Sequence, residues 1–142
     1  MKFKEPELQA QFNELPPRLQ EIGLFFDQLS DEMGIDAVAT RIWDPVPGDS
    51  GVHEAHRAID FRDETRSSDG QSAFLYTADQ VNHILTTINN QYPRTDGKLV
   101  AIHHSFNGMP YHFHLQIPIG WIGQASSSAR EPALPSSGST SS

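Results

Sequence analysis

The sequence contains no cysteine and few basic residues. Without cysteine there are no disulfides, no thiolate metal sites and no cysteine nucleophile, so any metal ion has to be bound by histidine and carboxylate side chains. Lys and Arg total 10 against 18 Asp and Glu, which gives a formal net charge of -8. An acidic surface repels phosphate backbones, and this balance argues against a general nucleic-acid-binding protein.

Long apolar runs are also missing. No stretch approaches the roughly 20 apolar residues that a membrane-spanning helix needs. Lys2 and Lys4 lie near the start of the chain, but no apolar segment follows them. We therefore expect no membrane insertion and no signal peptide.

The length of 142 residues fits one domain with a single hydrophobic core. Residues 1–15 are polar with scattered apolar positions and are expected to form an N-terminal arm or a short irregular helix. Residues 16–124 are expected to form the domain. Residues 125–142 consist mostly of Ser, Ala, Pro, Gly and Thr, which predicts a flexible tail because little apolar surface is available to offset the entropy of ordering.

Two amphipathic helices are predicted. In residues 16–34, two prolines suit the first helical turn, and Gly34 suits the end. Apolar residues between them recur at helical spacing: Leu19, Ile22, Phe26, Leu29 and Met33. Thr77 and Gln80 match a capping box, which predicts a second helix that ends near Tyr92.

Four segments have the apolar and β-branched composition of strands: Ala37–Trp43, Ala58–Arg62, Leu99–Phe106 and Tyr111–Ile117. The last two are separated by a strong turn signal and are expected to form an antiparallel hairpin. Residues 63–72 are polar and are expected to form a turn. These elements predict an α+β fold, in which a small antiparallel sheet carries the functional site and helices pack on its other face.

Six of the seven histidines lie in two short segments: His53 and His56 in one, and His103, His104, His112 and His114 in the other. Strand alternation places His112 and His114 on one face of the hairpin. A turn with an even number of residues would bring His103 onto that same face. A bulge would bring His104 there instead.

The earlier segment, residues 51–62, supplies a third imidazole, His53, and a carboxylate, Asp60. Catalytic zinc sites commonly use three protein ligands, often histidines with one carboxylate, and keep a fourth position for water. His53, Asp60 and one hairpin histidine satisfy that count. The alternative for Asp60 is an ordinary strand-end acid that pairs with Arg57 or Arg62.

Both segments resemble a known family. His53, Ala58 and Asp60 match the H-x4-A-x-D core of a motif in the D-Ala-D-Ala metallopeptidases, a superfamily that shares its fold with the hedgehog signalling domain and lysostaphin-type enzymes. The second motif of that superfamily is H-x-H. The sequence Tyr111-His112-Phe113-His114 is most similar to the Y-H-F-H of the penicillin-insensitive murein endopeptidases. The resemblance covers residues 37–117, and both motifs occur in the family's order.

The resemblance implies a zinc-dependent peptidase that cleaves peptides of bacterial peptidoglycan. Its zinc ligands would be His53, Asp60 and His114, with His112 as an additional site residue. Arg41 resembles the arginine that family members place before the first motif, where it could neutralise developing charge or hold a substrate carboxylate. The alternative for Arg41 is a surface or ion-pairing residue.

The sequence departs from the family at three points. Gly51 stands where the family usually has Ser, and His56 stands where it usually has Gly. The third departure is a missing acid, because many members have a Glu shortly before the last histidine that acts as general base. Murein endopeptidases are thought to use a histidine there, which implies catalytic roles for His103 or His104.

Two classes of function are therefore expected. The first is the zinc peptidase, which in the absence of an export signal suggests a phage lysis enzyme, cytoplasmic before its release, or a virion-associated enzyme. The second is a non-catalytic zinc-binding structural module of a virion or another assembly, which has kept the fold after losing the base. In either case the C-terminal tail could contact an assembly partner.

Overall fold

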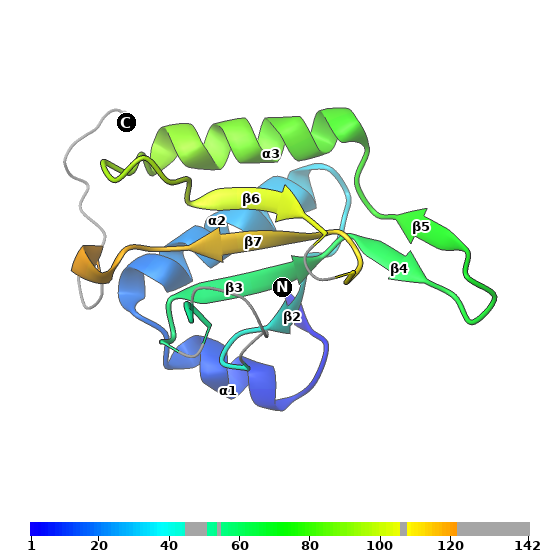
Figure 1. The fold of residues 1–142 in the computed structure, drawn as a ribbon, viewed down its shortest axis with the longest axis horizontal. Coiled ribbons are helices and arrows are strands. Elements are labelled where there is room, and N and C mark those ends of the chain that lie inside the picture. The colour runs from blue at the N-terminus through cyan, green and yellow to red at the C-terminus, as the bar shows by residue number, and fades with distance from the viewer. Residues whose placement is uncertain (45–50, 54, 106–107, 122–142) are drawn as a thin grey trace.

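A computed structural model describes residues 1–44, 51–53, 55–105 and 108–121 (Figure 1). In chain order the elements are β1 (Lys2–Phe3), α1 (Glu7–Asn13), α2 (Pro17–Glu32), β2 (Val38–Arg41), β3 (Ala58–Arg62), β4 (Glu64–Arg66), β5 (Ser72–Phe74), α3 (Ala78–Gln91), β6 (Ala101–His104), β7 (His112–Gln116) and the 3-10 turn η1 (Ile119–Trp121). The predicted tail, residues 125–142, lies outside the described residues. Within them, no helix has the length and apolar character that crossing a bilayer requires.

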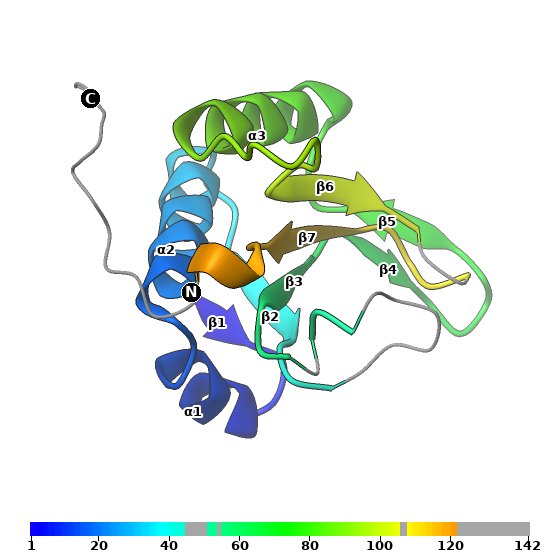
Figure 2. The ribbon, with the colours of Figure 1, turned by 60° about the vertical axis from the view of Figure 1, so that its left-hand side comes forward.

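Five strands form one sheet in the order β1-β2-β3-β7-β6 (Figure 2). β1 runs parallel to β2, and the other neighbours are antiparallel. The expected α+β fold with a mainly antiparallel sheet is therefore confirmed. Of residues 63–72, which were expected to be turn-like, only the part around residues 67–71 forms a turn, because β4 and β5 pair on either side of it as a separate two-stranded hairpin.

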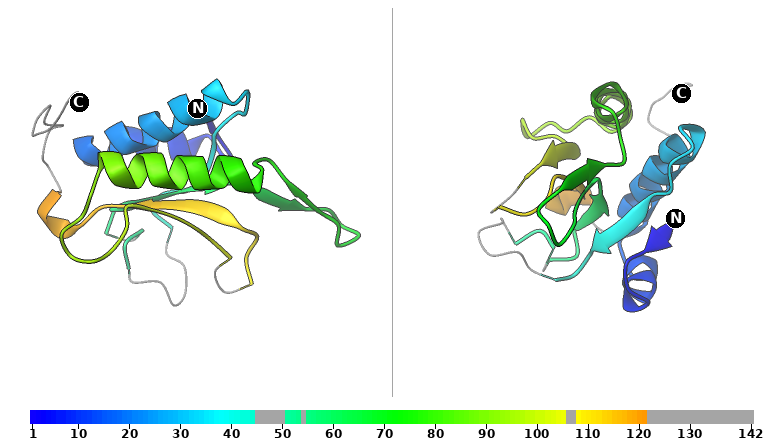
Figure 3. Two further views of the ribbon diagram at one scale, coloured as in Figure 1. Left: turned by 90° about the horizontal axis from the view of Figure 1, so that it is seen from above. Right: turned by 90° about the vertical axis from the view of Figure 1, so that its right-hand side faces the viewer.

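Helices α2 and α3 lie side by side on one face of the sheet, as expected (Figure 3). The capping box of α3 forms between Thr77 and Gln80, and Gly34 takes the left-handed conformation just after α2. Between the helices and the sheet, the ring of Phe26 stacks on Phe61 at 4.2 Å and meets Phe113 edge-on at 5.0 Å. Because side chains alternate along a strand, the residues next to these phenylalanines on β3 and β7 face away from the helices.

The first fifteen residues contain a short helix, which was one of the two alternatives expected, and they pack on the core instead of forming an arm. β1 extends the sheet beside β2, and α1 buries three apolar side chains in and just after it: Leu8, Phe12 and Leu15. A Cβ atom added at Gly23 of α2 would lie 3.0 Å from the Phe12 ring and 3.1 Å from Ile59. The absence of a side chain at Gly23 thus lets α1, α2 and β3 approach one another closely.

Phe12→Ala is expected to lower the free energy of unfolding by about 3–5 kcal/mol, the usual cost of removing a buried phenylalanine ring. Urea denaturation followed by circular dichroism measures this loss. Gln9→Ala on the exposed side of the same helix is the control and should change stability by less than about 0.5 kcal/mol. Equal, small effects for both variants would mean that α1 does not contribute to the core.

Candidate metal centre

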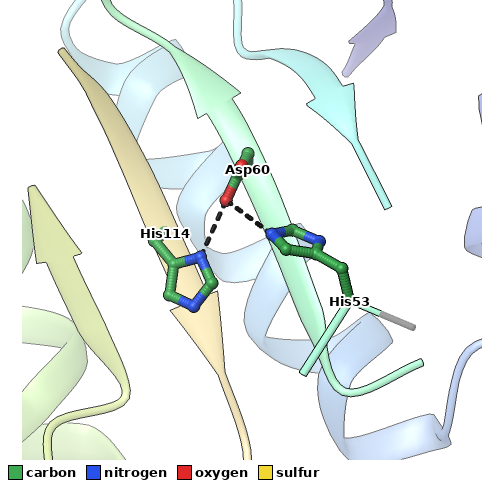
Figure 4. A group of neighbouring side chains, drawn as sticks. All are labelled: His53, Asp60 and His114. Atoms are coloured by element: carbon green, nitrogen blue, oxygen red, sulfur yellow. Dashed lines mark hydrogen bonds and ion pairs between the residues drawn. The ribbon is translucent and has the colours of Figure 1, made fainter. Parts of the chain in front are cut away.

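Three potential metal ligands meet on the sheet face opposite the helices (Figure 4). Asp60 on β3 is paired in register with His114 on β7, and His53 reaches them from the segment that precedes β3. The Oδ1 atom of Asp60 lies 2.8 Å from Nδ1 of His114 and 3.2 Å from Nε2 of His53. All three residues are buried. The grouping expected from the sequence is therefore present as a cluster that could bind a metal ion.

The hydrogen bond on the far side of the His53 ring determines which nitrogen faces the cluster without a proton. Nδ1 of His53 lies 2.9 Å from the carbonyl oxygen of Ile42, which can only accept a hydrogen bond. Nδ1 therefore carries hydrogen, and in the neutral ring the lone pair of Nε2 faces Asp60.

The same logic applies to His114 through Gln116. The side-chain amide nitrogen of Gln116 donates to the carbonyl oxygen of Leu99 at 3.2 Å, so its Oε1 atom is turned toward His114. Oε1 lies 3.1 Å from Nε2 of His114 and accepts a hydrogen bond from it. In the neutral ring the lone pair of Nδ1 then faces Asp60, as the lone pair of His53 does.

Two imidazole lone pairs and one carboxylate oxygen thus converge, and they need positive charge between them. One divalent cation bound by all three atoms would supply that charge. Zinc bonds of 2.0–2.1 Å in tetrahedral geometry would separate the ligand atoms by about 3.3 Å, and the two measured separations are within about 0.5 Å of that value. The outer hydrogen bonds to Ile42 and Gln116 are the type that orients histidine ligands in metal sites.

Asp60 is held in its ionised form. Burial by itself would raise the pKa of this carboxyl group. When the His114 and His53 nitrogens that face Asp60 carry hydrogen, the hydrogen bonds that they donate outweigh burial and hold the pKa well below its usual range. The Arg41 guanidinium lies farther away, with Nε 3.9 Å from Oδ2. The structure therefore places Arg41 beside the cluster, and Asp60 pairs with neither Arg57 nor Arg62 among the described contacts.

His104, rather than His103, lies on the side of the hairpin that faces the cluster. His104 pairs with His112, and His103 pairs with Phe113, whose ring belongs to the core on the opposite face. The expectation that His103 shares the face of His112 and His114 assumed an even number of residues in the turn. The connection instead comprises residues 105–111, an odd number. The expected position of His103 on this face was therefore wrong, and the alternative residue, His104, lies there.

His103 has a different partner. Its Nε2 atom lies 2.7 Å from Oδ2 of buried Asp63, and its ring stacks on Tyr111. The other carboxylate oxygen of Asp63 accepts hydrogen bonds from the backbone amides of Leu75 and Tyr76, at 2.9 and 3.1 Å. Asp63 thus joins β6 to the segment that leads into α3, and His103 has a structural contact rather than a place in the cluster.

Asp63→Ala is expected to reduce the free energy of unfolding by about 2–4 kcal/mol, because it leaves buried donors without an acceptor. The zinc content of the folded protein should not change, since Asp63 lies on the other face. Urea denaturation and elemental analysis measure the two quantities. Asp31→Ala, at an exposed position of α2, is the matched control. Loss of zinc from folded Asp63→Ala would contradict the structural role.

His112 and His104 lie next to the cluster without belonging to it. Nδ1 of His112 donates to the carbonyl oxygen of Pro110 at 2.9 Å, which leaves its Nε2 atom 3.6 Å from Oδ2 of Asp60. The His104 ring meets the rings of His112 and His114 at 4.8 and 5.6 Å. Burial, together with the nearby His112 and His114, lowers the pKa of His104 to about 4, so this ring is neutral at pH 7.

A pocket of about 160 Å³ opens beside the cluster. The charged and titratable residues that line it are Lys4, Arg41, Asp60, Arg62, Glu64, Tyr111 and His112. Glu64 accepts hydrogen bonds from the Ser72 hydroxyl, the Tyr111 backbone amide and the Arg66 guanidinium, and these lower its pKa to about 2. Glu64 is therefore an ionised group whose two oxygens are already occupied.

The backbone at His56 has a φ of +59°, in the left-handed region that favours glycine. The ring of His56 stacks on Trp43 at 4.3 Å, with an interplanar angle of 11°. The substitution of His for the motif's Gly therefore keeps the backbone conformation that a glycine would adopt most easily. The turn still delivers His53 to the cluster.

Places at or beside the site were not predicted for Lys4, Arg62 and Asp63. Arg62 could have been found, because it lies two positions after Asp60 on a strand and thus on the same face. Lys4 and Asp63 carry no local signal, since their neighbours come from distant segments of the chain.

Comparisons with known proteins give no match: no protein-family model, no curated protein and no solved structure matches this chain. Inferences about its function therefore rest on the residues of the site and on the resemblance of its two motifs.

Proposed function

We propose that the protein is a zinc-dependent peptidase that cleaves peptides of bacterial peptidoglycan. The observation that carries the proposal is the convergence of His53, Asp60 and His114, with each imidazole oriented by an outer hydrogen bond. These three residues are the ones that the resemblance to the D-Ala-D-Ala metallopeptidases assigns as zinc ligands. The left-handed backbone at His56, where that motif usually has Gly, is a second point of agreement.

Zinc is the metal that suits this set of donors. Two imidazoles and one carboxylate form a common ligand set of catalytic zinc, which keeps a further position open for water or substrate. Calcium and magnesium prefer oxygen ligands throughout, so the two histidines argue against them. The adjacent pocket provides space for a substrate group beside the cluster.

Bound zinc supplies Lewis-acid chemistry, because it lowers the pKa of water toward ~7 and polarises a carbonyl group. His112 is the residue placed to move protons. The hydrogen bond from its Nδ1 to Pro110 leaves Nε2 as an acceptor beside Asp60. Nε2 takes a proton from the attacking water and passes it to the departing amide nitrogen, so that water and the peptide bond yield a carboxylate and an amine.

Arg41 and His104 have supporting roles. The Arg41 guanidinium lies on the pocket side of Asp60 and is placed to stabilise negative charge that develops on the carbonyl oxygen. His104 packs against His112 and restricts the orientation of its ring. His104 thus acts through His112, whereas the sequence alone gave the proton-transfer role to His103 or His104.

A second candidate function is a non-catalytic zinc-binding module of a virion or another assembly. The observation that favours it is the lack of a free carboxylate at the hairpin: no Asp or Glu occurs between Gly97 and Ile117, and the nearby Glu64 is engaged by three donors. In this reading the same three ligands bind zinc for stability alone.

Peptide release from purified cell walls tests the two candidates against each other. Zinc-loaded protein is incubated with walls of several cross-link types, and new amino groups and soluble muropeptides are measured. The peptidase predicts release that a chelator stops and that added zinc restores. A fully zinc-loaded protein that releases nothing from any wall type would reject the peptidase and leave the structural module.

A further inference from the structure

The pocket beside the metal centre contains more positive charge than its own carboxylates can balance. Lys4, Arg41 and Arg62 line it together with only two acids, Asp60 and Glu64. Asp60 is engaged by the two histidines of the cluster, and Glu64 is engaged by Ser72, Arg66 and a backbone amide. If a metal ion were bound, the negative charge of Asp60 would be balanced by that ion. Asp60 would then not balance the charges of Lys4, Arg41 and Arg62 as well.

Lys4 and Arg62 are the two cations available to a ligand. Over the described part of the chain, the structure records no hydrogen bond or ion pair of either side chain, whereas Arg41 lies 3.9 Å from Asp60. Arg62 is two positions beyond Asp60 on β3, so the backbones of these two residues lie about 7 Å apart along the strand. Arg62 is paired in register with His112 of β7. Lys4 follows β1, and its backbone amide is bonded to Ala39 of β2 at 2.9 Å.

We propose that Lys4 and Arg62 bind a carboxylate of the substrate, within about two residues of the bond that is cleaved. The inference rests on the proposed function, because it takes the metal centre as the place where the reacting carbonyl binds. A guanidinium binds a carboxylate through two parallel hydrogen bonds, and an ammonium group beside it adds a second positive charge. The substrate class is then an acidic peptide with a free carboxylate, rather than one in which this group is amidated.

A ligand that cannot be hydrolysed separates this inference from catalysis. Adipate has two carboxylates, one for the metal and one for the pocket, and its monoamide has the same length with a single charge. Isothermal titration of zinc-loaded protein is expected to show adipate binding at least about tenfold more tightly than the monoamide, a typical gain for a hydrogen-bonded charge pair. Equal affinities would overturn the inference.

Three variants assign the effect to residues. Arg62→Gln should abolish the preference for adipate, Lys4→Gln should reduce it, and Arg62→Lys should retain part of it. Lys98→Gln, at an exposed site outside the pocket, should leave the preference unchanged. A preference that survives in Arg62→Gln would overturn the assignment. Tighter Arg62-dependent binding of inorganic phosphate than of adipate would overturn the choice of a carboxylate.

The outcome can be told apart from a failure of the proposed function. If the protein binds no zinc, the zinc-peptidase proposal fails, and the same two ligands are then titrated against the metal-free protein. An adipate preference that Arg62→Gln removes would still support the carboxylate site. If zinc binds and the preference is absent, only the carboxylate site is rejected.

Discussion

Alanine at His53, Asp60 or His114 is expected to remove zinc from the protein, which should otherwise hold about one zinc ion per chain. Three protein ligands leave no spare donor, so each loss should weaken binding by more than the 10- to 100-fold that an outer hydrogen-bonding partner contributes. Elemental analysis after dialysis against zinc buffers of known free concentration measures the affinity. Circular dichroism shows whether each variant is folded.

Two further variants provide an intermediate effect on zinc affinity and a control without effect. Gln116→Leu removes the partner that turns the His114 ring and should weaken zinc binding by about 10- to 100-fold, less than loss of a ligand. His83→Ala, on the exposed side of α3, should not change it. If His114→Ala keeps its zinc while His112→Ala loses it, the ligand assignment moves to His112, whose Nε2 atom is 3.6 Å from Asp60.

The cluster of His53, Asp60 and one hairpin histidine could be predicted from local patterns, and the resemblance of the two motifs singled out His114. Strand alternation puts His112 and His114 on one face, and the motif spacing links His53 to Asp60 in a short segment. Helix α3 could also be predicted from a local pattern, since Thr77 and Gln80 form the expected capping box. Local rules fix which residues share a face wherever a segment stays in one element.

The choice between His103 and His104 needed a contact that no local pattern contains. The backbone amide of Tyr111 donates to the Glu64 carboxylate, and its carbonyl oxygen accepts from the Glu64 backbone amide, both at 2.9 Å. Tyr111 is thereby drawn to β4 and leaves the hairpin ladder, so the connection is longer than the Asn-Gly turn signal suggested. A change of one residue in the number of loop residues reverses the face of every paired side chain.

For the N-terminal segment, the sequence allowed a short helix but gave no sign that it packs on the domain. Leu8, Phe12 and Leu15 do follow helical spacing, but a helix of 7 residues is marginal in isolation and its sequence is otherwise polar. Its stability comes from packing against α2 and β3, where Gly23 provides the space. Such a complementary site is visible only once the chain is folded.

His112→Ala is expected to lower peptide release by about 10²- to 10⁴-fold while zinc remains bound, because general acid-base catalysis contributes a factor of that size. Nε2 of His112 lies 3.6 Å from Oδ2 of Asp60, is left as an acceptor by the hydrogen bond from Nδ1 to Pro110, and is not assigned to the metal. His104→Ala removes the ring that packs on His112 and should cost less, about 10- to 100-fold, by the reasoning for outer partners of a site. The measurement is the rate of release per zinc-loaded, folded molecule.

His103→Ala is the matched control for this comparison, since it removes an imidazole from the neighbouring position of the same strand. Its partner is Asp63 on the opposite face, so the expected result is a lower unfolding temperature with an almost unchanged rate per folded molecule. A large loss of rate in His103→Ala with full stability would reverse the assignment of His103 and His104. It would mean that His103, and not His104, faces the metal during catalysis. Unchanged rates in both His112→Ala and His104→Ala would remove histidine from proton transfer altogether, and Arg41 would then be the remaining group of the expected catalytic set beside the metal centre.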